Sequence, residues 1–175
     1  MKAFTLPVLA LFVIAGCQSS EQAAMPEAQE ITFFLTSMNP GSGADLGGLE
    51  GADGYCVALA TKIGMGDKDW KAYLSTTAIN ARDRIGTGPW HNAEGVEIAS
   101  DLDMLHGENN LTKETQLNEH GEVVNGRGDD PNRHDILTGS TSAGMSMGDD
   151  GSDYTCSDWT SSSEDGSAIV GHHDR

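Results

Sequence analysis

The sequence is poor in basic residues, and this deficit limits what the protein can bind. It contains 10 lysine and arginine residues against 27 aspartate and glutamate residues, which gives a formal net charge of −17. Nucleic acids and anionic membrane surfaces both attract basic patches. We therefore expect no nucleic-acid partner, and an acidic exported module that can attract cations is the better interpretation.

The sequence also lacks the motifs of common catalytic sites. It has no Gly-x-Ser-x-Gly elbow and no phosphate-binding loop. No repeat of solenoid period is visible. Four histidines that could act as general acids or bases are scattered along the chain: His91, His106, His120 and His134. We therefore expect a protein that is not an enzyme.

A membrane-spanning run is absent from the N-terminus, although a shorter apolar run is present. Lys2 precedes an apolar stretch from Phe4 to Ala15, which is too short to cross a bilayer as a permanent helix. A positive start, a short apolar stretch and small residues at its end are typical of a secretory signal. An ordinary signal peptide that happens to contain a cysteine is the simplest alternative.

The end of this run, the letters IAGC with Cys17 last, resembles the lipobox of bacterial lipoproteins. The resemblance implies a signal peptide over residues 1–17 and lipidation of Cys17. No aspartate follows Cys17, so it also implies an outer-membrane lipoprotein, facing the periplasm or the cell surface. Residues 18–30 show no apolar periodicity and are predicted to be a flexible tether.

Residues 31–175 are long enough for one domain with a core, and they are rich in glycine and polar loops. Apolar residues from Ala52 to Ile63 recur at helical spacing, so we predict an amphipathic helix that ends near Gly64. Long polar stretches at 106–134 and 139–153 are expected to be loops. These features predict an α+β fold with short strands, which we place at residues 31–36, 70–75, 96–99 and 135–138.

Several blocks of this region resemble a known family. The stretch GLEGADGYCVALATKIGMGDKDWKAYLST, residues 48–76, resembles the start of the endostatin domain of basement-membrane collagens. It is more similar still to bacterial exported proteins usually labelled lectin-like, which blocks 80–99, 109–140 and 156–161 also match. The resemblance implies a C-type-lectin-like (endostatin-like) fold with two short antiparallel sheets, one or two helices and long loops.

The same resemblance implies a function and a pattern of disulfides. It implies a non-enzymatic ligand-binding module, with carbohydrate as the expected ligand; an adhesive module that binds extracellular protein is the alternative. In the family, the cysteine that corresponds to Cys56 pairs with a cysteine near the C-terminus. The cysteine that corresponds to Cys156 pairs with another one just before that. No cysteine follows Cys156. We therefore expect free thiols and a domain lacking its C-terminal strands, although a Cys56–Cys156 bridge is arithmetically possible.

The segment GRGDDPNRHD, residues 126–135, concentrates candidate ligand-binding residues. Asp129, Asp130 and Asn132, with Asp135 nearby, supply the oxygen ligands that calcium prefers. Calcium is the one cofactor that the sequence suggests, and the first three residues are also candidates for direct contact with a sugar. The alternative is a loop whose carboxylates only cap backbone amides.

Two tryptophans and the terminal histidines complete the candidates. Trp90 follows a Gly-Pro turn and could stack on a sugar ring, whereas the resemblance implies that Trp159 lies in the core. His172 and His173 are adjacent, and adjacent residues on a strand point to opposite sides. We therefore do not expect these two histidines to bind one zinc ion.

Overall fold

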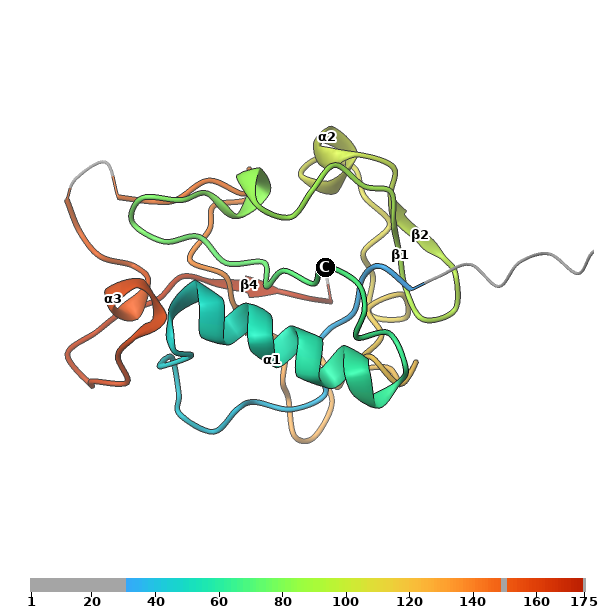
Figure 1. Cartoon of the computed structure of the whole chain (residues 1–175), viewed down its shortest axis with the longest axis horizontal. Coiled ribbons are helices and arrows are strands. Elements are labelled where there is room, and N and C mark those ends of the chain that lie inside the picture. The colour runs from blue at the N-terminus through green and yellow to red at the C-terminus, as the bar shows by residue number, and fades with distance from the viewer. Residues whose placement is uncertain (1–30, 149–150, 175) are drawn as a thin grey trace, which may run out of the picture.

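One helix of fifteen residues, two helices of four residues, a short 3₁₀ helix and two pairs of very short strands make up the regular structure of the described residues. The computed structural model describes residues 31–148 and 151–174 (Figure 1). The signal peptide with Cys17 and the tether, predicted over residues 1–30, lie outside the described residues. Among the residues that are described, no helix is both long and apolar enough to cross a membrane.

The elements confirm the α+β class. Strands β1 and β2 form one antiparallel pair, and β3 and β4 form a second. Helix α1 contacts α3, and α2 contacts β2. In chain order the elements are α1 (Gly48–Lys62), η1 (Ala81–Asp83), β1 (Trp90–His91), β2 (Glu97–Ala99), α2 (Leu102–Leu105), β3 (Asp135–Leu137), α3 (Cys156–Trp159) and β4 (Val170–His172).

The predicted helix is confirmed as α1, and it begins four residues earlier than the apolar spacing indicated. Its buried residues are Ala52, Leu59 and Ala60, which form the stripe expected from the sequence. The helix ends where predicted, because Gly64 adopts a left-handed backbone with φ of 79°. Its backbone N–H donates to the carbonyl of Thr61, which closes the last turn.

Two of the four strand predictions are confirmed and two are wrong. The predictions at 96–99 and 135–138 correspond to β2 and β3. Residues 31–36 form only an isolated bridge, between Leu35 and Asn118, and residues 70–75 form no strand. In the second segment the backbone N–H of Ala72 donates to Asp53 Oδ1 at 2.8 Å, so a side chain occupies a position that a neighbouring strand would need.

Asp53, the last residue of the G-A-D motif of α1, therefore ties the helix to the extended segment beside it. Its Oδ2 lies 2.7 Å from Nη2 of Arg84, and both side chains are mostly buried. Arg84 Nη1 in turn donates to the carbonyl of Ala72 at 2.5 Å. A charged hydrogen-bonded pair thus replaces the ladder of a sheet at this position.

Trp159 is the largest fully buried side chain, so its predicted place in the core is confirmed. It packs with Ala52 and Leu74, and its indole N–H donates to the carbonyl of Ser75 at 2.7 Å. All four residues of α3 have positive φ, between 49° and 67°. Such a left-handed turn is rare outside glycine, and hydrogen bonds from its backbone to Asp153 and Thr155 hold it.

Gly139 lies against the ring of Trp159 and connects it to the second sheet. It has a φ of 59°, and an added Cβ would lie 2.7 Å from Cζ2 of the tryptophan. The backbone N–H groups of Thr138 and Gly139 both donate to the carbonyl of Ile169, at 3.1 and 3.0 Å. These two hydrogen bonds lie directly beside the first residue pair of β3 and β4, Leu137 and Val170.

We predict that Gly139→Ala destabilises the domain more than Gly86→Ala. Both glycines have positive φ, but a Cβ at Gly86 would meet no atom within 4 Å. Gly86→Ala should therefore cost about 1 kcal/mol of backbone strain. Gly139→Ala should cost about 1–3 kcal/mol more, because the methyl group overpacks the core. Urea unfolding of the two variants measures the difference, and equal midpoints would show that Gly139 is not crowded.

The two described cysteines are free thiols in separate environments. Cys156 is buried at the start of α3, and Cys56 packs on the cluster of Ile31, Ala60 and Trp70. Burial raises the pKa of Cys56 from 9.0 to about 11, and the Asp53 carboxylate acts in the same direction. Cys56 is therefore expected to be a poor nucleophile at neutral pH.

We predict that alkylation of Cys56 by iodoacetamide rises with a midpoint near pH 11 in the folded protein. In urea the midpoint should return to the ordinary thiol range, and peptide mapping by mass spectrometry reports the rate at this residue. The native state keeps a proton that the unfolded chain loses, so this thiol should also lower the stability as the pH rises above 9. The same midpoint in both states would contradict the prediction.

Candidate functional site

A groove of about 1540 Å³ lies beside α1 in the described structure. Its lining comes from residues 32–40, from one side of α1, from residues 69–74, and from β3 and β4. In Figure 1, α1 crosses the front of the molecule and β4 passes behind it. Elements far apart in the sequence therefore contribute to one site.

The lining combines half-buried aromatic rings with polar side chains. The rings are those of Phe33, Phe34, Tyr55 and Tyr73. The polar groups include Asn39, Asp45, Arg133, Asp135 and His172. Rings can pack on the apolar face of a ligand while polar groups bond its hydroxyl or amide groups. This arrangement suits an extended ligand with both kinds of surface.

The predicted ligand-binding loop borders this groove, and its residues have different surroundings. Asp129 Oδ2 lies 2.6 Å from Lys113 Nζ and accepts the backbone N–H of Gly126. The hydrogen bond from Lys113 lowers the pKa of Asp129. Asn132 Oδ1 accepts the backbone N–H of His134 at 3.2 Å. Internal capping, the alternative considered for this loop, thus describes Asp129 and Asn132.

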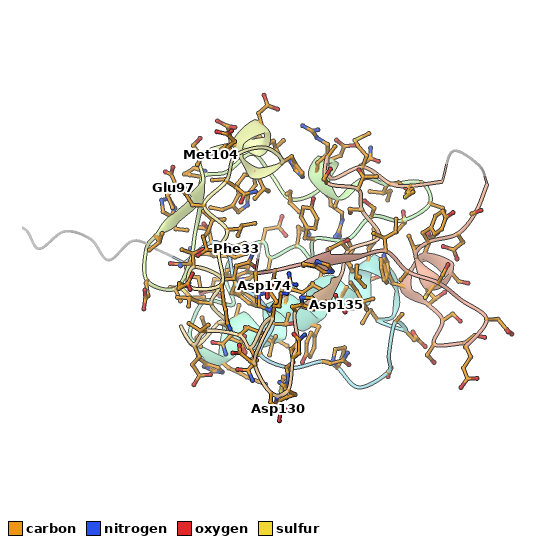
Figure 2. All side chains as sticks on the ribbon, turned by 180° about the vertical axis from the view of Figure 1, so that it is seen from behind. Phe33, Glu97, Met104, Asp130, Asp135 and Asp174 are labelled. Atoms are coloured by element: carbon orange, nitrogen blue, oxygen red, sulfur yellow. The ribbon has the colours of Figure 1, made fainter. Side chains whose placement is uncertain are left out.

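Asp130 and Asp135, the other two predicted calcium ligands, lie apart. Asp130 is exposed at the outer end of its loop, whereas Asp135 lies nearer the middle of the molecule (Figure 2). Among the described residues, the acidic and histidine side chains whose ligand atoms converge are His134, Asp135 and His172. Calcium binding by the loop stays a prediction. The atoms beside the Asp135 carboxylate are ring nitrogens of His134 and His172.

The three convergent side chains form a tight cluster, which we call the HDH cluster. Nε2 of His134 and Nε2 of His172 lie 3.3 and 3.2 Å from Oδ1 of Asp135. The two imidazole rings stack, with centroids 4.4 Å apart and planes only 10° from parallel. One ligand atom from each residue lies within 4.8 Å of the others.

The pairing of β3 with β4 explains how these residues meet. Asp135 and His172 are directly opposite in the antiparallel register, so their side chains share a face. His134 precedes β3 and is not bound by the alternation of a strand. Nε2 of His173 lies 3.2 Å from the carbonyl of Asn125, and His173 is not among the three residues whose ligand atoms converge.

A buried carboxylate lies behind the cluster. The side chain of Asp174 is 3% exposed, and its Oδ1 lies 3.7 Å from Nδ1 of His134. Neither of these two atoms has a hydrogen-bond partner. The backbone N–H of Arg127 donates to Oδ2 and lowers the pKa of Asp174, with a smaller effect from the nearby histidines. A Cβ on Gly126 would lie 2.6 Å from Oδ2, so a larger residue there would displace the carboxylate.

Trp90, the remaining predicted ligand-binding residue, is among the residues that line the groove. Trp90 is 8% exposed and packs with Ile98 and Ala99, so core contacts cover most of the ring that was expected to stack on a sugar. The structure groups His134 with His172 but leaves the other scattered histidines apart. His106, for example, contacts the hydroxyl of Tyr73 at 2.9 Å.

The HDH cluster was not predicted from the sequence, because its members come from two separate segments. The signal available was an adjacent His-Asp pair before one short apolar stretch and a His-His pair after another. Comparisons with known proteins do not assign the chain to a family: no family model matches it, and no curated protein does.

Proposed function

We propose that this protein is an exported lipoprotein, anchored through Cys17, whose non-enzymatic domain binds carbohydrate in the groove beside α1. The observation that supports the proposal best is the combination of four half-buried aromatic rings and polar side chains along one groove. We further propose that the fold is C-type-lectin-like. One main helix, short antiparallel strand pairs and long loops are compatible with that fold.

The dimensions and chemistry of the groove favour an oligosaccharide over a small apolar ligand. Its volume, about 1540 Å³, exceeds the roughly 300–1,000 Å³ of ordinary small-molecule pockets. A chain of sugar rings offers alternating apolar faces and hydroxyl edges, which match the mixed lining. The net charge of −17 disfavours a strongly anionic polysaccharide.

The proposal includes a calcium ion at the rim of the groove. Asp130 is exposed, and Asp135 lines the groove, so an ion held by the loop would lie at the rim, where it could bridge to sugar hydroxyls. Asp129 and Asn132 would have to give up their present hydrogen bonds to join it. Binding of sugar should then depend on calcium and on these loop residues.

We predict that replacing groove residues weakens glycan binding. A glycan array identifies the ligand, and titration calorimetry then compares Tyr55→Ala and Arg133→Ala with the unaltered protein. Each variant should bind about 10-fold more weakly, a loss of about 1.4 kcal/mol. Glu164→Ala is the matched control, because Glu164 is an exposed charge outside the groove, and it should leave the glycan affinity unchanged.

Asp130→Ala and Asn132→Ala test the calcium loop. Glycan binding of each variant is measured with calcium and with chelator.

The outcomes separate the alternatives. Sugar binding that survives both loop changes and ignores calcium would exclude the loop from the mechanism and leave the groove. Binding that also survives the groove changes would exclude the groove. Absence of binding to any glycan, together with saturable binding of an extracellular matrix protein, would favour the adhesive function instead.

We predict that Cys17→Ser abolishes acylation and releases the protein from the membrane fraction. The thiol of Cys17 is the group that would carry the lipid, and serine removes it while keeping a similar size. Metabolic labelling with a fatty acid, followed by fractionation, measures both effects. If the unaltered protein is unlabelled and already in the soluble fraction, the proposed anchor is wrong.

A further inference from the structure

We infer that the HDH cluster binds one divalent transition-metal ion, with Zn²⁺ as the best match. The ligands would be Nε2 of His134, Oδ1 of Asp135 and Nε2 of His172. This site differs from the predicted calcium loop in its donor atoms and shares only Asp135 with it. The inference does not depend on whether the groove binds carbohydrate.

The spacing of the donor atoms supports this assignment. Zinc binds imidazole nitrogen and carboxylate oxygen at about 2.0–2.2 Å with tetrahedral angles, so two ligand atoms of one ion lie about 3.4 Å apart. The two nitrogen-to-oxygen distances in the cluster are 3.3 and 3.2 Å. The distances therefore match those between ligand atoms of one ion, and one imidazole ring would have to turn out of the stack so that both nitrogen lone pairs point at the metal.

The donor set selects the class of metal. Two imidazole nitrogens and one carboxylate oxygen suit zinc and its neighbours in the first transition row. Calcium and magnesium prefer six or more oxygen ligands, which this cluster does not offer. Three protein ligands also leave a coordination position open, as in zinc sites that take a further ligand.

Asp174 provides an independent indication of a metal. When a metal occupies Nε2 of a histidine, the ring proton must sit on Nδ1, and a carboxylate commonly accepts it. Nδ1 of His134 faces Oδ1 of Asp174 at 3.7 Å, and both atoms are buried without another partner. The backbone N–H of Arg127 and the absence of a side chain at Gly126 fix the other carboxylate oxygen. A metal on the far side of the ring explains this otherwise costly burial.

A hydrogen-bonded His-Asp-His cluster without metal is the competing explanation. In that case Nε2–H of each ring would donate a hydrogen bond to Oδ1 of Asp135. A neutral His134 that donates from Nε2 has no proton on Nδ1 to offer to Asp174. A metal ion at Nε2 places the ring proton on Nδ1, where Oδ1 of Asp174 can accept it, so the position of Asp174 favours the metal.

The position of the cluster suggests what the open coordination position serves. Asp135 and His172 both line the groove, so an ion held between them lies at its wall. A hydroxyl, carboxylate or carbonyl oxygen of a groove ligand could complete the coordination. This part of the inference rests on the proposed function, whereas metal binding itself does not.

The test is a metal titration of the whole protein without any glycan. After treatment with chelator, Zn²⁺ is titrated by calorimetry, and Co²⁺ is added as a spectroscopic probe. We expect one equivalent of metal to bind and visible absorption typical of tetrahedral Co²⁺. His172→Ala and Asp135→Asn should each weaken Zn²⁺ binding by at least 10-fold. Asp174→Asn should weaken it by about 10- to 100-fold, because it alters the hydrogen bond to His134.

Two matched controls and a folding check make the result decisive. His120→Ala removes a histidine outside the cluster, 46% exposed, and Glu164→Ala removes an exposed acid; both should bind Zn²⁺ as the unaltered protein does. Asp135 is 58% exposed, so Asp135→Asn should fold normally, which circular dichroism verifies even if His172→Ala unfolds.

Three results would overturn the inference. These are no Zn²⁺ binding by the unaltered protein, unchanged binding by Asp135→Asn, and displacement of Zn²⁺ by equimolar Ca²⁺. If metal binds as expected but glycan binding is the same with and without Zn²⁺, the metal site stands and its link to the groove ligand fails. If no glycan binds at all, the proposed function fails without affecting the metal site.

Discussion

The burial of Trp159 against Gly139 and Ser75 is the contact on which the rest of the structure depends. It joins α3, the extended segment 70–75 and the end of β3 at one point. From this point the backbone bonds to the carbonyl of Ile169 set the register of β3 and β4. A slip of one residue would turn every side chain of a strand to the opposite face. His173 would then replace His172 opposite Asp135, and the HDH cluster would be lost.

A second constraint is that side chains hold much of the backbone that regular sheets would hold elsewhere. Asp53 and Arg84 bond the backbone of Ala72, and the 31–36 segment forms one isolated bridge and scattered hydrogen bonds, several of them with side chains. Segments held in this way need not lie flat against one another. The groove between α1 and the strands is therefore bordered by irregular chain that can carry aromatic and polar side chains, as binding sites on loops commonly do.

The proposed sugar site and the inferred metal site meet at Asp135. Its carboxylate is the one group shared by the oxygen-rich loop at 126–135 and the nitrogen donors His134 and His172. In the present geometry, the Asp135 carboxylate cannot bind an ion together with the loop and at the same time together with the histidines. Because calcium selects oxygen ligands and zinc accepts nitrogen, the identity of the bound metal distinguishes the two arrangements.

The elements that form through contacts between near neighbours in the chain could be predicted from the sequence. Helical spacing from Ala52 to Ile63 with Gly64 after it predicted α1, and short β-branched stretches predicted β2 and β3. Its fold class, α+β, follows from those elements. The placement of Trp159 in the core came from the resemblance to endostatin-like domains, and the structure agrees.

The other features of the fold and of the candidate site could not be predicted from the sequence, because the contacts that determine them join distant segments. Residues 31–36 and 70–75 have strand-like composition, but the bonds from Asp53 and Arg84 show that the second segment's partners are side chains. The left-handed turn at Cys156–Trp159 contains no glycine, so the sequence gives no signal for it. Nothing in the sequence near Asp135 indicates that His172 lies opposite, since that register depends on the contact between Trp159 and Gly139. A site assembled across a sheet register is visible only once the register is known.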